Sequence, residues 1–449
     1  MDTHWASKSI WPRLCFEAFP PHWMETIMSE VLGKDIKRVG ILFAGGPAPA
    51  ANAVISSAAM AFLAHKIEVV GILHGYSSLN DYDAEKRPLV EGSDYRLLQM
   101  EDVEESRNFR GIMIGSARTN PGKYINCAAD LEDAEKAAPL RRTYDALCSI
   151  GVDALISIGG DDTLKTANKL YEYQRHNPSC KKHIRVIHLP KTIDNDYRGI
   201  DFTFGFFTAV NLIAEEVLNL RADSKASNAY FIVECMGRKA GWLSYGVAIA
   251  GEAQMVISVE DIPDIMHEAG REDTEFLDVD VLVNKIVNLI LAREKRGHSY
   301  GVVILAEGLA EKLPPKFLET IALDEHGHIS LGDLHLGHMV AKKVAARYQE
   351  ITGKKKKVNG VQYGYESRCA LPHAFDVMLG SALGAGAFDA LVLKGLDGHM
   401  VSTVGQLDLT FVPFSELVDP VTLVTEVRYI DPNSDFHRLA KSLADDLNK

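Results

Sequence analysis

Short apolar runs, each followed by a polar loop and then by a helix, recur along this chain, and they constrain the fold more than any other feature. The run from Arg38 to Ala44 is the first, and an alanine-rich helix reaches about His65 after a glycine-rich turn. The runs from Ala154 to Ile158 and from Ile184 to Leu189 repeat the pattern. Buried strands that alternate with helices are typical of parallel sheets in α/β proteins.

We therefore predict an α/β fold of two Rossmann-like, three-layer domains with mostly parallel sheets and an active site in the cleft between them. Open sheets of this kind bind ligands beyond the carboxyl ends of their strands. The runs 111–115 and 390–393 are also predicted as strands. Seven glycine-rich or charged loops should meet in the cleft, and they contain Gly45, Arg118, Asp161, Lys191, Arg238, Glu307 and Arg368.

The loop from Pro190 to Asp196 (PKTIDND) has the strongest chemical content. It places two carboxylates two residues apart, with a lysine three residues before the first. Such a loop can hold a base and a metal-facing oxygen on one side, with a cation nearby. An ordinary turn is the alternative interpretation, because Asn and Asp favour turns in any protein.

A second acidic loop, Gly159 to Thr163 (GGDDT), lies upstream. Its two glycines allow the backbone to approach a ligand closely. Asp161 can face Mg²⁺, which prefers carboxylate and phosphate oxygens. Asp162 is unusual beside a phosphate, because a second carboxylate would repel or displace a further phosphate or nucleotide group. Capping of the following helix is the structural alternative, and it explains one aspartate better than two.

Three further loops suit an anion. The turn that contains Gly46 joins a strand to a helix, a geometry that presents backbone N–H groups to phosphate. Arg118 and Arg238 follow apolar runs, and guanidinium donors match phosphate oxygens. Glu307 brings another carboxylate to a strand end. Surface ion pairs and exposed loop charges are the alternatives.

Composition limits the partners and the compartment. The 449 residues carry a formal net charge of −13, which argues against nonspecific binding to nucleic acid or to an anionic membrane. The six cysteines form no CxxC pair, so we expect neither a zinc site nor a disulfide framework. We recognise no signal peptide and no apolar run that approaches a membrane span, and we therefore expect a cytoplasmic protein.

The ordered set GGPAPAAN, GSARTN, GGDDT, PKTIDND, MGRKAGW, AEG and GYESR resembles the phosphofructokinase superfamily, over about Arg38 to Phe414. PKTIDND and MGR are the most specific members of the set. In that family, ATP enzymes typically carry glycine after GGD and before TIDND. This chain has Asp162 and Lys191 at the two places, and so it resembles the diphosphate-dependent branch.

A physical argument points the same way. The Asp162 carboxylate would obstruct the innermost phosphate of a nucleotide. The Lys191 ammonium can neutralise charge on the diphosphate oxygens as they separate.

The resemblance implies reversible, Mg²⁺-dependent phosphoryl transfer from diphosphate to the 1-hydroxyl of fructose 6-phosphate. Asp194 would be the general base, and Asp161 with Asp196 would hold Mg²⁺. The implied catalytic set is Asp194, Lys191, Asp162 and Arg238, and the implied diphosphate site is Gly46, Arg118 and Lys191. The implied sugar-phosphate pocket contains Thr192, Ile193, Asp194, Met236, Gly237, Arg238, Glu307, Tyr365 and Arg368.

The resemblance also implies a division of the chain. Residues 1–35 form an N-terminal extension, residues 36–206 plus 367–411 form the diphosphate- and Mg²⁺-binding domain, and residues 207–366 plus 412–449 form the fructose 6-phosphate-binding domain.

The chain departs from the pattern of the ATP enzymes at several positions. Pro47 stands where those enzymes often have Asp, and Tyr365 stands where many have His. Arginines that they lend across a subunit boundary have no clear equivalent, and Lys225, Tyr230 and Lys357 are the candidates here.

Three alternatives stay open: an ATP-dependent 6-phosphofructokinase, a noncatalytic regulatory subunit of the same fold, and a kinase that acts mainly on sedoheptulose 7-phosphate. Family habit suggests a homodimer, or a homotetramer, with no nucleic-acid or membrane partner. The sequence does not decide the oligomeric state, the effectors, or the roles of the N-terminal extension and of Lys354 to Lys357.

Overall fold

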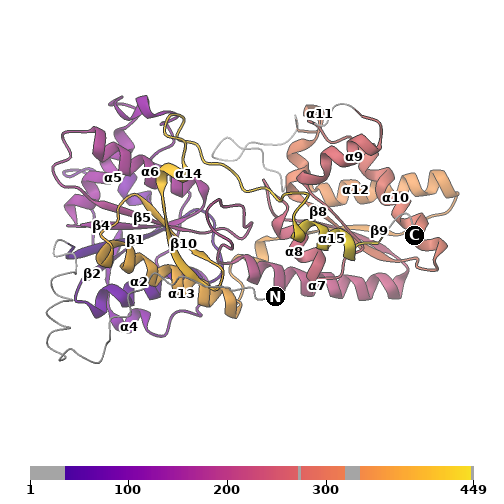
Figure 1. Ribbon diagram of the computed structural model, residues 1–449, viewed down its shortest axis with the longest axis horizontal. Helices are drawn as coiled ribbons and strands as arrows, with labels where there is room; N and C mark the ends of the chain where they lie inside the picture. The colour runs from indigo at the N-terminus through magenta and orange to yellow at the C-terminus, as the bar shows by residue number, and fades with distance from the viewer. Residues whose placement is uncertain (1–35, 272–274, 319–333, 446–449) are drawn as a thin grey trace, which may run out of the picture.

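The computed structural model describes residues 36–271, 275–318 and 334–445, and the predicted N-terminal extension lies outside them. The described chain forms two lobes, each built around its own sheet (Figure 1). The predicted α/β class with two mostly parallel sheets is confirmed.

The first lobe contains a sheet of seven strands among the described residues, in the order β11-β10-β5-β4-β1-β2-β3. The two outer strands, β3 and β11, run antiparallel to their neighbours, and the other pairs are parallel. The strands are β1 (Arg38–Ala44), β2 (Glu68–Ile72), β3 (Tyr95–Leu98), β4 (Ala154–Gly159), β5 (Arg185–Pro190), β10 (His399–Val404) and β11 (Asp408–Pro413).

Helices cover both faces of this sheet (Figure 1). They are α2 (Ala51–Ala64), α3 (Ser77–Asn80), α4 (Met100–Val103), the 3₁₀ helix η1 (Ala128–Leu131), α5 (Ala138–Ser149), α6 (Asp161–His176), α13 (Ala374–Phe388), the π-helix η6 (Asp389–Leu393) and α14 (Phe414–Leu417). The chain moves from β1 toward β2 on one side and from β4 toward β5 on the other. The strand order therefore reverses between β1 and β4, which is where open α/β sheets bind ligands.

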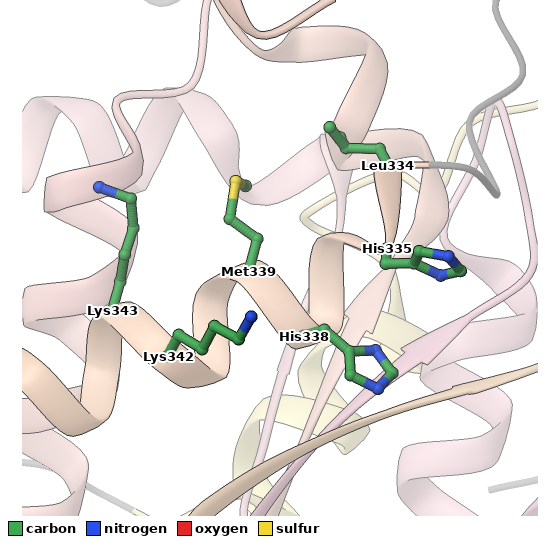
Figure 2. A pocket seen from close by; sticks show the side chains of 6 residues that line it. All are labelled: Leu334, His335, His338, Met339, Lys342 and Lys343. Atoms are coloured by element: carbon green, nitrogen blue, oxygen red, sulfur yellow. The ribbon is translucent and has the colours of Figure 1, made fainter.

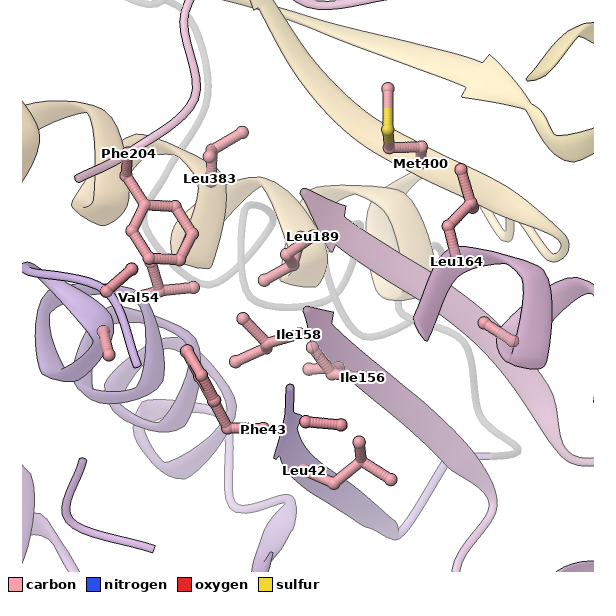
Figure 3. Close-up of a cluster of buried hydrophobic side chains, with 14 of the residues drawn as sticks. Leu42, Phe43, Val54, Ile156, Ile158, Leu164, Leu189, Phe204, Leu383 and Met400 are labelled. Atoms are coloured by element: carbon pink, nitrogen blue, oxygen red, sulfur yellow. The ribbon is translucent and has the colours of Figure 1, made fainter. Parts of the chain in front are cut away.

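The core of the first lobe lies between this sheet and its helices, and Figure 3 shows part of it. Phe43 of β1, Ile158 of β4 and Leu189 of β5 are fully buried there, together with Val54 of α2 and Leu383 of α13. Strands that are buried on both faces read as continuous apolar runs, which explains why these three could be recognised from the sequence.

The second lobe has four parallel strands among its described residues, in the order β7-β8-β6-β9. The strands are β6 (Tyr230–Cys235), β7 (Met255–Ile257), β8 (Gly301–Ala306) and β9 (Val358–Tyr363). The helices are α7 (Phe206–Ser227), α8 (Trp242–Ala250), η2 (Val259–Asp261), α9 (Ile262–Glu268), α10 (Val279–Lys295), η3 (Glu307–Lys312), α11 (Pro315–Leu318), α12 (Leu336–Thr352), η5 (Tyr365–Ser367) and α15 (Asp435–Leu443).

Three described segments connect the lobes: the start of α7, residues 364–373 between β9 and α13, and residues 418–434 between α14 and α15 (Figure 1). The first two are tied together at the junction. Asp376 on α13 accepts hydrogen bonds from the backbone N–H and the hydroxyl of Thr208 on α7, at 2.7 and 2.6 Å.

Two predicted strands are wrong. Residues 111–115 form turns, because Gly111 and Gly115 have positive φ angles of 75° and 67°. The Asn52 side chain holds this backbone instead, through the carbonyl groups of Phe109 and Gly111 and the N–H of Met113. Residues 390–393 continue α13 as the π-helix η6, since a short buried apolar run does not distinguish a strand from a helix.

The first sheet extends two residues past the predicted domain boundary at residue 411. Val412 and Pro413 pair with Met400 and His399 in the first sheet, whereas the predicted division assigns both residues to the second domain. The β10–β11 hairpin therefore belongs as a whole to the first lobe.

One stretch of the described chain, Ala374–Leu393, is long and apolar enough to cross a membrane by length and composition, contrary to the expectation that no run approaches a span. In the apolar window of 18 residues within it, 61% is buried. Gly384 lies against α2, where a Cβ would come 2.4 Å from the Val54 carbonyl oxygen. Packing inside the first lobe therefore accounts for its apolar composition.

Candidate active site

The strand ends bring the predicted loops together. In the first lobe Ala44 pairs with Gly159 and Gly159 pairs with Pro190, so β1, β4 and β5 end side by side. In the second lobe Cys235 pairs with both Ala306 and Tyr363, so β6, β8 and β9 also end together. Six of the seven predicted loops therefore follow adjacent strands.

The seventh loop, which contains Arg118, reaches the same place without a preceding strand. Ala117 bridges to Ala44 at the end of β1, and its carbonyl accepts the N–H of Gly45 at 2.9 Å. The Ser116 hydroxyl donates to the Gly45 carbonyl at 2.6 Å. Gly46 and Arg118 consequently line one pocket of about 390 Å³ together with Cys369. A pocket of this size suits a small ligand but does not select one.

Lys191 is an almost buried cation, only 7% exposed. Its ammonium nitrogen, Nζ, lies between two glycines. A Cβ atom added to Gly45 would be 3.6 Å from this nitrogen, and one added to Gly160 would be 3.8 Å from it. Burial lowers the pKa of Lys191 to about 8, while the negative charges of Asp194 and Asp196 oppose the shift. Lys191 therefore lies at the reversal point of the strand order, close to both backbone turns that could hold an anion.

Asp194 lies in a turn that other side chains hold in place. Its N–H donates to Thr192 Oγ1 at 3.0 Å, and the following residue, Asn195, adopts a positive φ of 55°. Asn195 Oδ1 accepts the N–H of Thr203 at 3.0 Å. The Asp194 Oδ1 atom is buried and accepts no hydrogen bond within the described residues.

The environment of Asp194 suits a proton acceptor. Burial and, to a smaller extent, the negative charges of Asp196 and Glu307 raise the pKa of its carboxyl to about 7, against the opposing charges of Arg368 and Lys191. A general base is most effective when its pKa is near the working pH.

Asp161 and Asp196 lie on one small cavity of about 20 Å³, at the ends of β4 and β5. Asp161 Oδ2 is 3.1 Å from Lys165 Nζ and 3.5 Å from Lys239 Nζ, and Asp161 Oδ1 accepts the Thr425 hydroxyl. Burial raises the pKa of Asp196, the nearby Lys239 charge lowers it, and the Asp161 charge raises it.

This donor set fits Mg²⁺, which protein sites usually bind through one or two carboxylates, while substrate phosphates and waters complete the shell. Asp161 and Asp196 supply that number. No cluster of three or more His, Cys, Asp or Glu side chains suited to a metal occurs in the part of the chain that the structure describes.

Asp162 does not line this cavity. Its side chain is 68% exposed in the first turn of α6, and its Oδ1 is 2.7 Å from Lys165 Nζ. Its backbone carbonyl accepts the Thr166 hydroxyl, which also donates to Asn120 in the Arg118 loop. The carboxylate is therefore exposed to solvent, on the helix that contacts the Arg118 loop.

Arg368 joins the two lobes at the site. Its Nη2 donates to Met236 Sδ at 3.5 Å in the second lobe, and its guanidinium lies over the Tyr365 ring. A Cβ at Gly46 in the first lobe would be 3.7 Å from its Cζ. An anion bound near Arg368 would therefore contact both lobes.

Arg238 and Glu307 complete the second-lobe side. The N–H of Gly308 donates to the Gly237 carbonyl at 3.1 Å, and a Cβ at Gly308 would lie 2.3 Å from the Arg238 carbonyl oxygen. Glycine is therefore required for these two loops to approach each other. Arg238 Nε donates to Glu311, and both line a pocket of about 420 Å³. Burial raises the pKa of Glu307, and Arg238 and Arg368 oppose that shift.

A separate pocket of about 600 Å³ contains none of the predicted site residues. Figure 2 shows its lining along the first turns of α12, where two imidazoles lie at one end and a lysine at the other. The lining residues are Leu334, His335, His338, Met339, Lys342 and Lys343.

The structure adds three residues that sequence reasoning missed. Lys239 directly follows Arg238 in MGRKAGW, and its charge is the one feature that could have drawn attention to it. Thr425 and Arg428 belong to no recognised motif, and they reach the site only through the tertiary fold. Tyr230, a candidate for a contact across a subunit boundary, is fully buried inside the second lobe and is not available for such a contact.

The chain matches known proteins along most of its length. A family model described as Phosphofructokinase matches residues 38–391. The chain is 34% identical over 416 residues to the pyrophosphate–fructose 6-phosphate 1-phosphotransferase of Thermotoga maritima, covering 90% of each chain. It is 31% identical to the Naegleria fowleri protein of the same name, over 92% of this chain and 88% of that one.

More distant matches include a protein with another donor. The chain is 28% identical to the ATP-dependent 6-phosphofructokinase of Chloroflexus aurantiacus, over 91% of this chain and 96% of that one. A pyrophosphate-dependent phosphofructokinase from Marinobacter aquaeolei has the same fold, with a TM-score of 0.61, 18% identity, and coverage of 91% and 92% of the two chains.

Proposed function

The chain belongs to the phosphofructokinase family, and we propose that it transfers a phosphoryl group reversibly from diphosphate to the 1-hydroxyl of fructose 6-phosphate. The products are fructose 1,6-bisphosphate and phosphate, so the enzyme acts in glycolysis and gluconeogenesis. The observation that carries the proposal is the nearly buried Lys191 ammonium, which lies between the two glycine turns of the first lobe and near Asp194.

The relatives support diphosphate as the donor. The relatives at 31–34% identity are named for pyrophosphate, and those named for ATP are 28–29% identical. Lys191 supplies one positive charge beside the anion pocket, and a charge held in a site with little water is worth more than one in solvent. In this proposal the exposed Asp162 carboxylate, in the first turn of α6, repels the further phosphates of a nucleotide.

Asp194 acts as the general base in this proposal. It accepts the proton of the sugar 1-hydroxyl while that oxygen forms its bond to the transferred phosphorus. The bond from that phosphorus to the bridging oxygen of diphosphate breaks in line, and phosphate leaves. The free and buried Oδ1 atom of Asp194 can accept the hydroxyl without first losing another partner.

Mg²⁺ is the proposed metal, held by Asp161 and Asp196, and it would supply positive charge to the diphosphate oxygens. Gly46, Arg118 and Lys191 bind the diphosphate. The second lobe binds the sugar phosphate, and Arg238 also stabilises charge that develops during transfer. The proposed sugar-phosphate residues are Thr192, Ile193, Asp194, Met236, Gly237, Arg238, Glu307, Tyr365 and Arg368.

The division of the chain follows from these roles. We assign diphosphate and Mg²⁺ to residues 36–206 and 367–413, with the boundary moved to the end of β11, and the sugar phosphate to residues 207–366 and the C-terminal part. A homodimer, or a homotetramer, in the cytoplasm is the proposed state, and sedimentation of the purified chain measures it.

Donor exchange tests the proposal. Wild-type protein should transfer from diphosphate and show little activity with ATP at saturating fructose 6-phosphate. The Lys191→Gly variant should lose about 10²- to 10³-fold in kcat/KM for diphosphate, because one charge that stabilises the transition state is gone. Asp162→Gly should improve the use of ATP relative to diphosphate. Lys355→Gly, in the exposed charge run, serves as the control.

Other outcomes would point to the alternatives. Robust activity of the unmodified protein with ATP would show that ATP, and not diphosphate, is the phosphoryl donor. Purified chain that releases no phosphate from diphosphate, with Mg²⁺ and fructose 6-phosphate present, would support a noncatalytic subunit. Sedoheptulose 7-phosphate, assayed in parallel, tests the sugar.

A further inference from the structure

The segment between α14 and α15, residues 418–434, crosses from the first lobe to the second (Figure 1). We call it the C-terminal strap. It has no part in the mechanism above, yet it passes directly over the two acidic loops. Its contacts fall into two groups, one on each lobe.

On the first lobe the strap is bonded to both acidic loops. The Thr425 hydroxyl donates to Asp161 Oδ1. The Arg428 backbone N–H donates to the Asp196 carbonyl at 2.9 Å, and its Nη2 donates to the Asn195 carbonyl at 2.7 Å. One stretch of four residues therefore contacts the loop after β4 and the loop after β5.

On the second lobe the same stretch is anchored beside the MGRKAGW loop. The Trp242 indole N–H donates to the Arg428 carbonyl at 2.8 Å, and the Arg428 guanidinium lies 4.7 Å from the centre of the Trp242 ring. The Ile430 N–H donates to Glu260 at 3.1 Å. Residues 425–430 of the strap are thus bonded to both lobes.

The strap also closes the small cavity. Thr425 and Glu426 line the space of about 20 Å³ together with Asp161, Asp196 and Lys239. That volume holds about one water-sized particle. Thr425 occupies Oδ1 of Asp161, and the other oxygen, Oδ2, faces the ammonium groups of Lys165 and Lys239. The hydroxyl therefore fixes which carboxylate oxygen is turned toward positive charge.

We propose that the C-terminal strap is a positioning element of the metal site, in which Thr425 orients the Asp161 carboxylate and Arg428 orients the turn of Asp196. The inference rests on the proposed function, because it assigns the metal to these two aspartates. Loss of a hydrogen bond to a metal-binding side chain commonly weakens metal binding by about 10- to 100-fold.

Three variants of the full-length protein test the role of the hydroxyl. Thr425→Val removes it and keeps the shape, and Thr425→Ser keeps it. Thr422→Val makes the same change in the same strap, at a hydroxyl that donates to Asp419 instead. Circular dichroism and the melting temperature establish that each variant folds.

The main measurement is the Mn²⁺ dissociation constant in the presence of methylenediphosphonate, a diphosphate analogue that is not cleaved. The electron paramagnetic resonance signal of free Mn²⁺ reports how much of the metal is unbound. We expect Thr425→Val to bind Mn²⁺ about 10-fold more weakly, whereas Thr425→Ser and Thr422→Val stay within twofold of the wild type. In turnover, Thr425→Val should raise the KM for diphosphate and leave the KM for fructose 6-phosphate unchanged.

Unchanged or tighter Mn²⁺ binding by Thr425→Val would overturn the inference. Equal weakening by the Val and Ser variants would also overturn it, because a role of the hydroxyl requires rescue by serine. Failure of the proposed function looks different: wild-type protein would then transfer nothing from diphosphate, while the Mn²⁺ comparison would still decide the role of Thr425.

Discussion

Asp194 and Glu234 are two carboxyl groups whose pKa burial raises to about 7, and they differ in what surrounds them. Asp194 Oδ1 is buried without a hydrogen bond from the described residues, and its carboxyl lies near the charges of Lys191 and Arg368. Glu234, on β6, is fully buried inside the second lobe, where it accepts the N–H of Gly337 at 3.0 Å. The Asp194 carboxyl keeps one oxygen for the proton transfer that we propose, whereas the Glu234 carboxyl caps the first turn of α12.

Replacement of Asp194 should separate activity from stability. We expect Asp194→Asn to lower kcat by about 10²- to 10⁴-fold, because the general base is lost. The same variant should be more stable by about 1 kcal/mol, because a poorly solvated charge is removed. Thermal unfolding and steady-state kinetics measure the two effects.

Asp201→Asn, at an exposed loop residue, is the matched control and should change neither property by much. A less stable Asp194→Asn protein would contradict the view that the native carboxylate is held at an energetic cost.

Glu234 should make stability depend on pH. Its pKa is raised from 4.5 to about 7 in the folded protein, chiefly by burial, with the Gly337 N–H opposing the shift. Between these values the folded state holds a proton that the unfolded state has lost, so the free energy of unfolding decreases as the pH rises from about 4.5 to 7. We expect Glu234→Gln to remove this dependence.

The measurement is the free energy of unfolding from pH 5 to pH 8, by urea titration. The free energy of unfolding of Glu234→Gln, relative to that of the wild type, should increase by on the order of 2 kcal/mol between pH 5 and pH 8. Glu268→Gln, at an exposed position on α9, should show no such gain. Parallel profiles for Glu234→Gln and the wild type would mean that the carboxyl is not protonated in the folded state.

At the scale of elements, α13 shows how a helix can be recognised and its partner missed. Its alanines and glycines predict a closely packed helix, which the structure contains. The helix against which it packs, α2, lies more than 300 residues earlier in the chain. No local pattern contains that pairing, because it depends on the two helices covering the same face of one sheet.

Two glycines of α13 should respond differently to alanine. At Gly384 a Cβ would lie 2.4 Å from the Val54 carbonyl oxygen, whereas at Gly380 the nearest atom is Val54 Cγ2, at 3.1 Å. Alanine favours a helix by about 1 kcal/mol over glycine, but a forced shift of the backbone costs about 1–3 kcal/mol. We expect Gly384→Ala to destabilise the protein clearly and Gly380→Ala to be nearly neutral. Urea unfolding compares the two, and equal effects would contradict the packing argument.

At the scale of the whole molecule, one apolar cluster extends through both lobes. It contains Phe43 and Leu189 of the first lobe, Val217 of α7, and Val233 and Ile304 of the second lobe. A smaller cluster, which includes Ile286 of α10 and Val340 of α12, lies on the other side of the second sheet. The two lobes therefore share a core, and they are not connected by a linker alone.

A shared core should make unfolding cooperative. Trp242 is the one tryptophan after residue 35, and the others are Trp5, Trp11 and Trp23. In a protein with phenylalanine at those three positions, Trp242 fluorescence reports on the strap contact, and far-UV circular dichroism reports on both lobes. We expect the two urea transitions to coincide. Midpoints that differ by more than the fitting error would show that the lobes unfold separately.

The sequence alone determined the fold class and the order of most loops that meet at the candidate site, because buried parallel strands are continuous apolar runs and the residues after them can be read in order. Lys191, Asp194 and the acidic loops could be proposed as site residues for that reason. Tertiary structure decided what lies next to them: the Arg118 loop reaches β1 without a strand of its own, and Thr425 meets Asp161 across 264 positions of the chain. Such contacts depend on how two lobes and a crossing segment pack, and no local pattern of residue types encodes that arrangement.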